Sequence, residues 1–155
     1  MGVNLIKINL LAIGDIKEEF YTQAVNEYKK RLTRFCTLNI IELKESIHKN
    51  PQTALKMDEQ NLMPYLKGYV IALAIEGKPV SSTELANKIS KLRLNAPEIT
   101  FIIGASNGLS QQIKNKANEL ISFSPLTFPH QLMRVIFLEQ LYRSFTIINN
   151  ISYHK

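Results

Sequence analysis

The segment Phe101-Ile102-Ile103-Gly104-Ala105-Ser106-Asn107-Gly108-Leu109 decides the fold class. The apolar run from Ile99 to Ile103 predicts a buried strand, and helical spacing returns from Gln111 to Leu120. Between them, two glycines four positions apart allow positive φ angles and close approach of the backbone to a ligand. The same turn also suits an ordinary strand-to-helix connection. A buried strand that passes through a turn into a helix is the repeating unit of an α/β fold.

The alternation of strand and helix patterns extends over the rest of the chain. Apolar runs predict further strands at 3–13, 37–43, 69–75 and 121–128. Helical spacing predicts helices at 17–35, 51–65, 81–92 and 131–147, and Ser81 with Glu84 forms a capping-box pattern. This order predicts a mainly parallel sheet with helices on both faces, in one domain that spans residues 1–155. Ligands of such sheets bind beyond the carboxyl ends of strands, here the turns after Gly14, Ile75, Ile103 and Leu126.

Composition favours a cytoplasmic protein with a polyanionic partner. The 155 residues include 19 Lys and Arg against 13 Asp and Glu, a net charge of +6 that suits nucleic acid but also occurs without such a partner. Cys36 is the only cysteine, and His48, His130 and His154 lack metal-ligand spacing, so no disulfide and no metal site are expected. No apolar run approaches the roughly 20 residues of a membrane span. The first residues also lack the order of a signal peptide.

Two common kinds of site lack their motifs. The chain has no G-x-x-x-x-G-K-[ST] loop, and Gly14 is followed by Asp15-Ile16 instead of a G-x-G-x-x-G pattern. These absences argue against a P-loop nucleotide triphosphatase and a dinucleotide-dependent oxidoreductase. Ser110 also lacks the G-x-S-x-G context of a nucleophilic serine, whereas Ser106 has that spacing.

The segment Ser122-Phe123-Ser124-Pro125-Leu126-Thr127-Phe128-Pro129-His130 is apolar but contains two prolines. Proline cannot donate a hydrogen bond to a strand ladder. The segment is therefore either an irregular edge strand or a stretch whose free backbone groups recognise the edge of a base.

The next segment, from Gln131 to Phe145, predicts a helix that is apolar around most of its circumference. Such a helix is buried on several sides, in a core or in a subunit interface, and we expect part of it to meet a second copy in a homodimer. An unpaired buried charge is costly, so Arg134 is either paired within the fold or faces a polar site. Glu139 and Arg143 stand four apart in the favourable order for a structural ion pair.

The chain ends with Asn149-Asn150-Ile151-Ser152-Tyr153-His154-Lys155. An aromatic ring, an imidazole and a cation in sequence can stack on a base and contact phosphate. A frayed terminus is the alternative, because the last residues of most domains are poorly ordered.

Taken together, these motifs resemble the ribosomal RNA large-subunit methyltransferase H family of small SPOUT-type pseudouridine N3-methyltransferases. The resemblance rests on Phe-Ile-Ile-Gly-x-x-x-Gly-Leu at 101–109, Leu-Thr-Phe-Pro-His at 126–130, Arg-Val at 134–135, Glu-Gln-Leu-Tyr-Arg at 139–143 and Tyr-His at 153–154. It spans nearly the whole chain and is densest after residue 100. It implies a C-terminal trefoil knot, S-adenosylmethionine bound inside the knot, a homodimer, and a ribosomal RNA substrate recognised on the assembled ribosome.

The resemblance also implies site residues. Carried over by motif, the cofactor contacts fall on Leu73, Gly104, Phe123, Ser124, Pro125, Leu126, Thr127 and Phe128. The candidates for orienting the base and stabilising its charge are His130, Arg134, Tyr153 and His154. The chain departs from the family pattern at Ala105, where a second glycine is common, and at Lys155, where arginine is usual.

Two rival functions remain open at this point. A nucleotide-binding oxidoreductase predicts NAD(P)H binding, and the missing glycine fingerprint counts against it. A non-catalytic RNA-binding protein predicts RNA affinity without S-adenosylmethionine binding.

Overall fold

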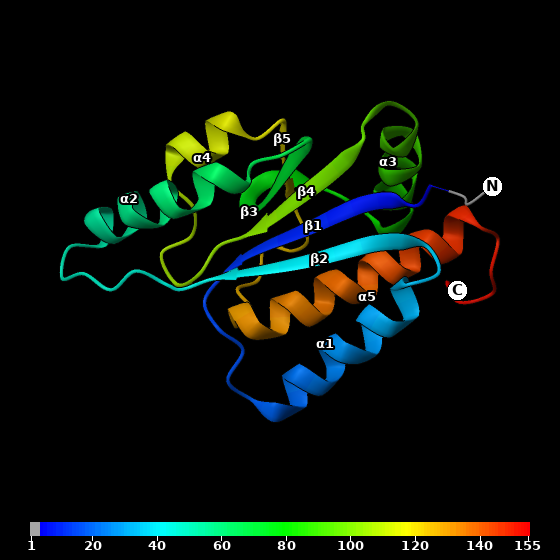
Figure 1. Ribbon diagram of the computed structural model, residues 1–155, viewed down its shortest axis with the longest axis horizontal. Helices are drawn as coiled ribbons and strands as arrows, with labels where there is room; N and C mark the ends of the chain where they lie inside the picture. Colours follow the sequence, from blue (N-terminus) through cyan, green and yellow to red (C-terminus); the bar gives the residue numbers. More distant parts are fainter. Residues whose placement is uncertain (1–3) are drawn as a thin grey trace.

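The computed structural model describes residues 4–155 and places them in a five-stranded sheet with helices on both faces (Figure 1). The strands are β1 (Ile6–Ile13), β2 (Cys36–Leu43), β3 (Tyr69–Pro79), β4 (Glu98–Ile103) and β5 (Glu119–Ser122), in the spatial order β2-β1-β4-β3-β5. All neighbouring pairs in this sheet are parallel, which confirms the expected α/β class. Val3, at the start of the first expected strand, lies outside the described residues.

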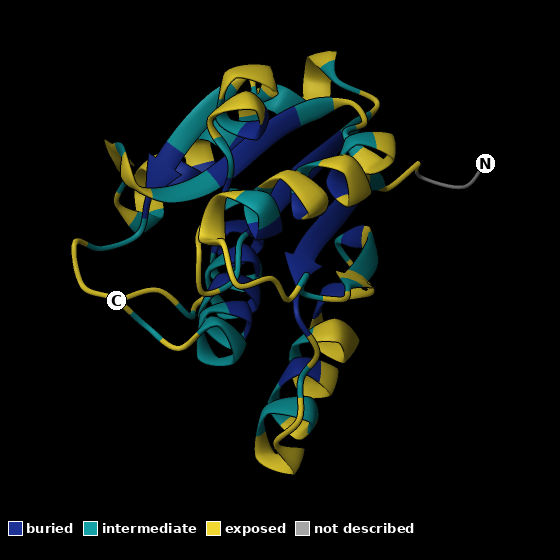
Figure 2. Cartoon of the chain, turned by 90° about the vertical axis from the view of Figure 1, so that its left-hand side faces the viewer, coloured by how far each residue is buried: buried dark blue, intermediate teal, exposed yellow. Residues whose placement is uncertain are grey.

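The helices form two layers that sandwich the sheet. On one face lie α1 (Glu19–Leu32), α3 (Ser82–Asn95) and α5 (His130–Ile148). On the other lie α2 (Pro51–Leu62), the 3₁₀ turn η1 (Met63–Tyr65) and α4 (Gln111–Lys116). Successive strand residues point to opposite faces, so Leu10 joins the core under the first layer and Leu11 joins the core under the second. The strands are accordingly buried between exposed helix surfaces (Figure 2).

The C-terminal helix α5 packs between α1 and α3 and completes the larger core. Phe137 lies 4.8 Å from Phe101 of the sheet between ring centroids, and Phe145 stacks on Phe35 at 5.6 Å. Its Leu138 and Leu141 are fully buried. Further apolar residues of α5 are only partly covered, namely Leu132, Val135, Ile136, Ile147 and Ile148.

Three expected boundaries were wrong near the C-terminal half of the sheet. The helix expected to reach Leu120 ends at Lys116, because Asn118 forms hydrogen bonds with Val70 at the start of β3 instead of continuing the helix. Its N–H donates to the Val70 carbonyl at 2.8 Å, and its side-chain oxygen accepts from the Val70 N–H at 2.8 Å. The fifth strand begins at Glu119 and stops at Ser122, so residues 123–128 form a loop instead of continuing the strand.

The third strand was expected to end at Ile75, but it continues to Pro79 through a bulge. Leu73 and Lys78 both pair with Ile121 of β5, so residues 74–77 loop out of the ladder between them. Gly77 permits this close passage, because a Cβ there would lie 2.7 Å from the backbone N and C of Ile121. Bulges of this kind re-aim side chains.

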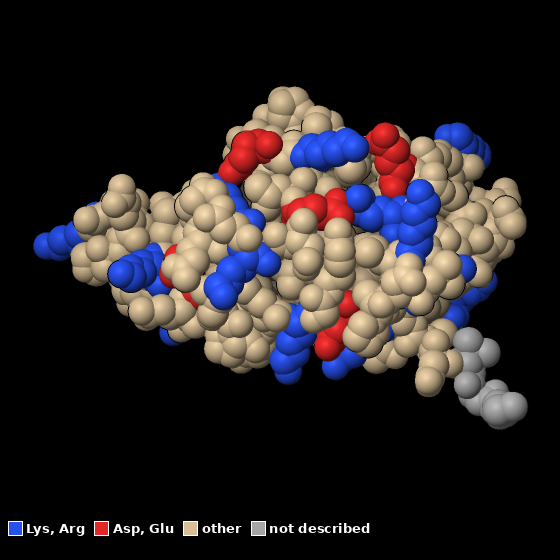
Figure 3. All heavy atoms as spheres, turned by 90° about the horizontal axis from the view of Figure 1, so that it is seen from above, with Lys and Arg blue, Asp and Glu red and all other residues tan. Residues whose placement is uncertain are grey.

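None of the helices in the described part of the chain is long and apolar enough to cross a membrane. On the face seen in Figure 3, lysine and arginine side chains alternate with acidic ones instead of gathering in one block.

Candidate functional site: a pocket at the carboxyl edge of the sheet

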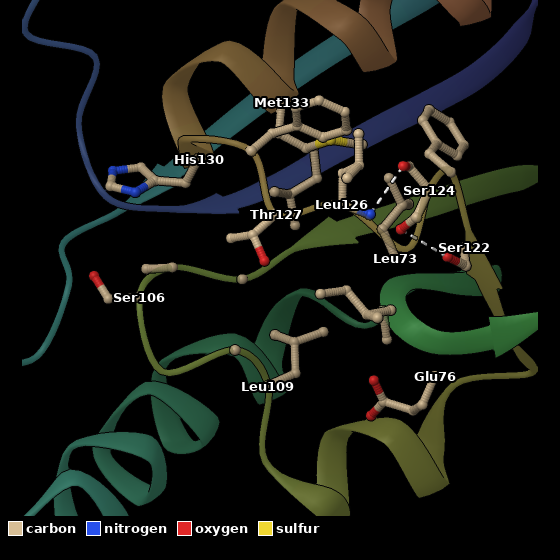
Figure 4. A pocket seen from close by; sticks show the side chains of 18 of the residues that line it. Leu73, Glu76, Ser106, Leu109, Ser122, Ser124, Leu126, Thr127, His130 and Met133 are labelled. Carbon is tan, nitrogen blue, oxygen red and sulfur yellow. Dashed lines mark hydrogen bonds between the residues drawn. The ribbon is translucent and has the colours of Figure 1, made fainter.

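A pocket of about 380 Å³ opens beside the bulge of β3 and the carboxyl ends of β4 and β5, against the start of α5 (Figure 4). Three loops and two helices form its walls. The lining residues are Leu73, Ala74, Ile75, Glu76, Ile103, Gly104, Ala105, Ser106, Gly108, Leu109, Lys114, Ser122, Phe123, Ser124, Leu126, Thr127, Phe128, His130 and Met133. Its place fits the rule that ligands of parallel sheets bind beyond the carboxyl ends of strands. Three of the four turns singled out from the sequence contribute to it.

The turn after β4 shapes one wall through its glycines. A Cβ at Gly104 would lie 2.8 Å from the carbonyl carbon and oxygen of Gly108, so a side chain there would push the turn apart. Gly108 has a φ of +71°, a conformation that favours glycine, and its N–H donates to the Ala105 carbonyl at 2.9 Å. The methyl group of Ala105 packs against the core beneath α2 and α4. This residue therefore fills space in the fold as well as lining the pocket.

The loop between β5 and α5 forms the opposite wall. Ser124 orders it, since the Ser124 hydroxyl accepts from the Leu126 N–H at 3.0 Å and the Ser122 hydroxyl donates to the Ser124 carbonyl at 3.2 Å. Among the hydrogen bonds of the described residues, none uses the backbone N–H of Thr127 or Phe128. Leu126 is 66% exposed although it borders an apolar pocket. This loop thus offers free backbone donors beside apolar side chains, which is what recognition of a heteroaromatic base requires.

Of the eight residues expected to contact a cofactor, seven line the pocket and Pro125 does not. Pro125 is exposed and lies in the same loop.

Of the four residues expected to act on the substrate, His130 alone lines the pocket. It stands at the first position of α5 and projects at the end of the pocket nearest the 104–108 turn (Figure 4). Its imidazole lies against Gly14, where a Cβ would come within 3.3 Å of His130 Nε2. The turn after β1, which also has a positive φ of 98° at Gly14, is therefore packed around this side chain.

Arg134 lies in the core and not at the pocket. It is 1% exposed, and its Nη2 donates to the carbonyl oxygens of Ile13, at 3.0 Å, and Gly14. Its Nη1 lies 3.4 Å from the Glu42 carboxylate at the end of β2. Burial lowers the pKa of Arg134, and the nearby Glu42 and Asp15 oppose that shift. The sequence left two alternatives for Arg134, a partner within the fold or a polar site. The structure shows it paired within the fold.

Tyr153 and His154 fold back against α5 at Glu139 and Arg143. These two positions are roughly 14 and 20 Å along the helix from His130, at a rise of about 1.5 Å per residue. The Tyr153 hydroxyl donates to Glu139 at 3.0 Å, and the Arg143 guanidinium lies 4.8 Å from the centre of the Tyr153 ring. Arg143 also contacts His154 Nδ1 at 3.2 Å and pairs with Glu139 at 2.6 Å, as expected from their spacing. Burial and the bond to Glu139 raise the pKa of Tyr153 to about 12. In a single chain the tail is therefore ordered, and it lies away from the pocket.

The two charged residues of the pocket were missed from the sequence. Glu76, carried out of the ladder by the β3 bulge, forms an ion pair with Lys114 of α4, and both line the pocket. Lys114 holds the pKa of Glu76 below its usual range. The pair could not be found from motifs, because the bulge that re-aims Glu76 depends on how β3 meets Ile121.

Among residues 4–155, no group of three or more His, Cys, Asp or Glu side chains is arranged to hold a metal ion.

Comparisons with known proteins agree with this geometry. A family model described as "Predicted SPOUT methyltransferase" matches residues 6–154. A relative from Caldicellulosiruptor saccharolyticus, named ribosomal RNA large subunit methyltransferase H, is 44% identical over 96% of this chain and 99% of its own. One of the same name from Clostridium botulinum is 42% identical over 97% of this chain and 100% of its own. A solved probable methylase family protein from Haemophilus influenzae shares the fold, with a TM-score of 0.58 at 13% identity over 97% of this chain and 71% of that one.

The parallel sheet with helices on both faces and a pocket at its carboxyl edge places the chain among the α/β proteins. Within that class, the chain belongs to the SPOUT methyltransferases and, among them, to the ribosomal RNA large subunit methyltransferase H family.

Proposed function

We propose that this protein transfers a methyl group from S-adenosylmethionine to N3 of a pseudouridine in large-subunit ribosomal RNA. The observation that carries the proposal is the pocket, since seven of the eight motif-derived cofactor positions line one cavity at the carboxyl edge of the sheet. An rRNA substrate, which the relatives' names indicate for those proteins, also suits the net charge of +6. The same substrate would place the protein in the cytoplasm.

The residues present fit an adenosyl group. The free N–H groups of Thr127 and Phe128 can donate to the edge of adenine, while Leu73 and Leu109 supply apolar walls. Gly104 lets the turn after β4 close tightly on Gly108, and this closed turn forms one wall of the pocket. When bound, S-adenosylmethionine supplies an activated methyl group on a sulfonium centre.

On the substrate side, His130 is the pocket residue positioned to contact the incoming base. Its ring is held beside Gly14, and Arg134 fixes that turn from within the core through the Ile13 and Gly14 carbonyls. We assign Arg134 to positioning, because it does not line the pocket. The enzyme contributes orientation and stabilisation of negative charge on the base as N3 loses its proton.

We further propose that the active form is a homodimer in which the tail of one chain completes the pocket of the other. Tyr153 and His154 lie far from the pocket of their own chain, yet they present an aromatic ring and an imidazole suited to a base. The partly covered Leu132, Val135 and Ile136 of α5 supply an apolar surface for a two-fold contact.

Two finer features belong to the same proposal. The return of the chain from β5, at one edge of the sheet, to α5, which packs between α1 and α3, is compatible with a chain end threaded as a trefoil knot. The excess of basic over acidic residues is only six, so few phosphate contacts are available and the sequence-independent affinity for RNA should be modest. We therefore propose that it recognises a composite surface on the assembled ribosome.

Calorimetry with S-adenosylmethionine is the first test, and it should show one saturable site per chain. NAD(P)H binding without S-adenosylmethionine binding would favour an oxidoreductase, and RNA binding alone would favour a non-catalytic RNA-binding protein. Transfer of a labelled methyl group should then be faster on assembled ribosomes than on naked large-subunit RNA, with the label on N3 of pseudouridine by mass spectrometry. Equal rates on both substrates would contradict recognition of the assembled particle.

A further inference from the structure

The pocket is polarised along its length. Glu76 lies at one end and His130 at the other, with Leu109 between them (Figure 4), and Lys114 is paired with Glu76. Among the described residues that line the pocket, Glu76 and Lys114 are the two that carry full charges. One end thus presents a negative and a positive group side by side, whereas the middle is apolar.

The placement of this pair is built into the fold. Residues 74–77 leave the ladder because Ile121 pairs with both Leu73 and Lys78, and this bulge carries the Glu76 carboxylate toward α4. The Lys114 side chain is 19% exposed, and that of Glu76 is 55% exposed. Charges at such a half-covered site interact more strongly than they do in open water.

We infer that Glu76 and Lys114 form the subsite for the α-amino acid end of the methyl donor, with Glu76 facing its ammonium and Lys114 its carboxylate. The inference rests on the proposed cofactor. An α-amino acid group carries opposite charges on one carbon, which matches a pair of opposite side-chain charges. Its entry replaces one ion pair with a closed set of four alternating charges, so that neither side chain is left without an opposite charge. The apolar walls at Leu73 and Leu109 then receive the adenosyl portion.

Two alternatives lead to different measurements. If the Glu76 carboxylate binds ribose hydroxyls, it recognises every adenosine ligand alike. If the pair only ties the bulge to α4, it contributes to stability and leaves ligand affinity unchanged.

The test compares two ligands that differ only at the end in question. S-adenosylhomocysteine carries the amino acid group, and 5′-methylthioadenosine has a methyl group in its place. Calorimetry of the full-length protein should show that Glu76→Gln and Lys114→Met each weaken S-adenosylhomocysteine binding by roughly tenfold or more, the cost of losing a charged hydrogen bond. Both variants should keep the wild-type affinity for 5′-methylthioadenosine.

Lys116→Met is the matched control, because Lys116 is an exposed lysine of the same helix that does not line the pocket. It should bind both ligands as wild type does. Glu76→Gln keeps the side-chain shape at a largely exposed position, so the test stands even if Lys114→Met fails to fold. Equal weakening of both ligands, or no weakening of either, would overturn the inference. A wild-type protein that binds neither ligand would instead overturn the proposed cofactor.

Discussion

Replacing Arg134 should destabilise the fold while leaving cofactor binding intact. In Arg134→Met, the buried carbonyl oxygens of Ile13 and Gly14 lose their donor, and each such loss costs about 1–3 kcal/mol. The Glu42 carboxylate, 39% exposed, can recover solvent and adds little. Methionine keeps most of the packing volume. We therefore expect the free energy of unfolding to fall by about 3 kcal/mol, which in a domain of this size lowers Tm by roughly 6–12 °C.

Urea and thermal unfolding monitored by circular dichroism measure this loss. Arg31→Met is the matched control, since Arg31 is 41% exposed and pairs with Glu27 on the surface of α1. That change should cost less than about 1 kcal/mol. Cofactor affinity well below Tm should persist in Arg134→Met. A variant of normal stability that has lost all methyl transfer would refute the reasoning and return Arg134 to the chemistry.

Three further predictions concern the pocket, the dimer and the tail. Gly104→Arg should abolish S-adenosylmethionine binding, because a Cβ there meets the Gly108 carbonyl at 2.8 Å and the side chain would displace the turn that forms one wall of the pocket; normal calorimetric affinity in the folded variant would remove Gly104 from the site. Mixing the inactive variants Gly104→Arg and Tyr153→Ala/His154→Ala should restore methyl transfer once subunits exchange, and heterodimers without activity would exclude a shared site. In ultraviolet titration, Tyr153 should ionise near pH 12, as should Tyr69 beside Glu119, and Tyr153→Phe should remove part of that late step. Since the raised pKa stabilises the protonated fold, this contribution is complete below pH 10 and lost between about pH 10 and 12.

The sequence predicted the fold where local pattern and tertiary structure agree. The apolar run before Gly104 is a buried strand, and the Ser81–Glu84 capping box is formed, with Glu84 N–H donating to the Ser81 hydroxyl at 3.2 Å. The predicted ends of helices and strands were wrong where residues distant in the sequence form hydrogen bonds with them. Asn118 ends its helix by pairing with Val70, a contact that no local periodicity reveals.

The site was predictable to a similar degree. Loop residues that line the pocket carry motifs, so Gly104 and the 123–128 loop could be named in advance. The role of Arg134 could not be predicted, because it depends on whether the side chain is buried. Its burial results from the packing of α5 against the Gly14 turn. The pairing of Glu76 with Lys114 depends on a bulge set by strand register, which sequence patterns do not encode.

The position of α5 at the end of the chain has a consequence for how the protein is made. During synthesis, α1 and α3 emerge first with apolar faces that α5 later covers, including Leu32 and Leu85. The same helix brings His130 and Met133 to the pocket. A nascent chain therefore cannot close its main core or its pocket until α5 has been synthesised. Truncated products should consequently be inactive and prone to degradation, instead of forming partly working enzymes.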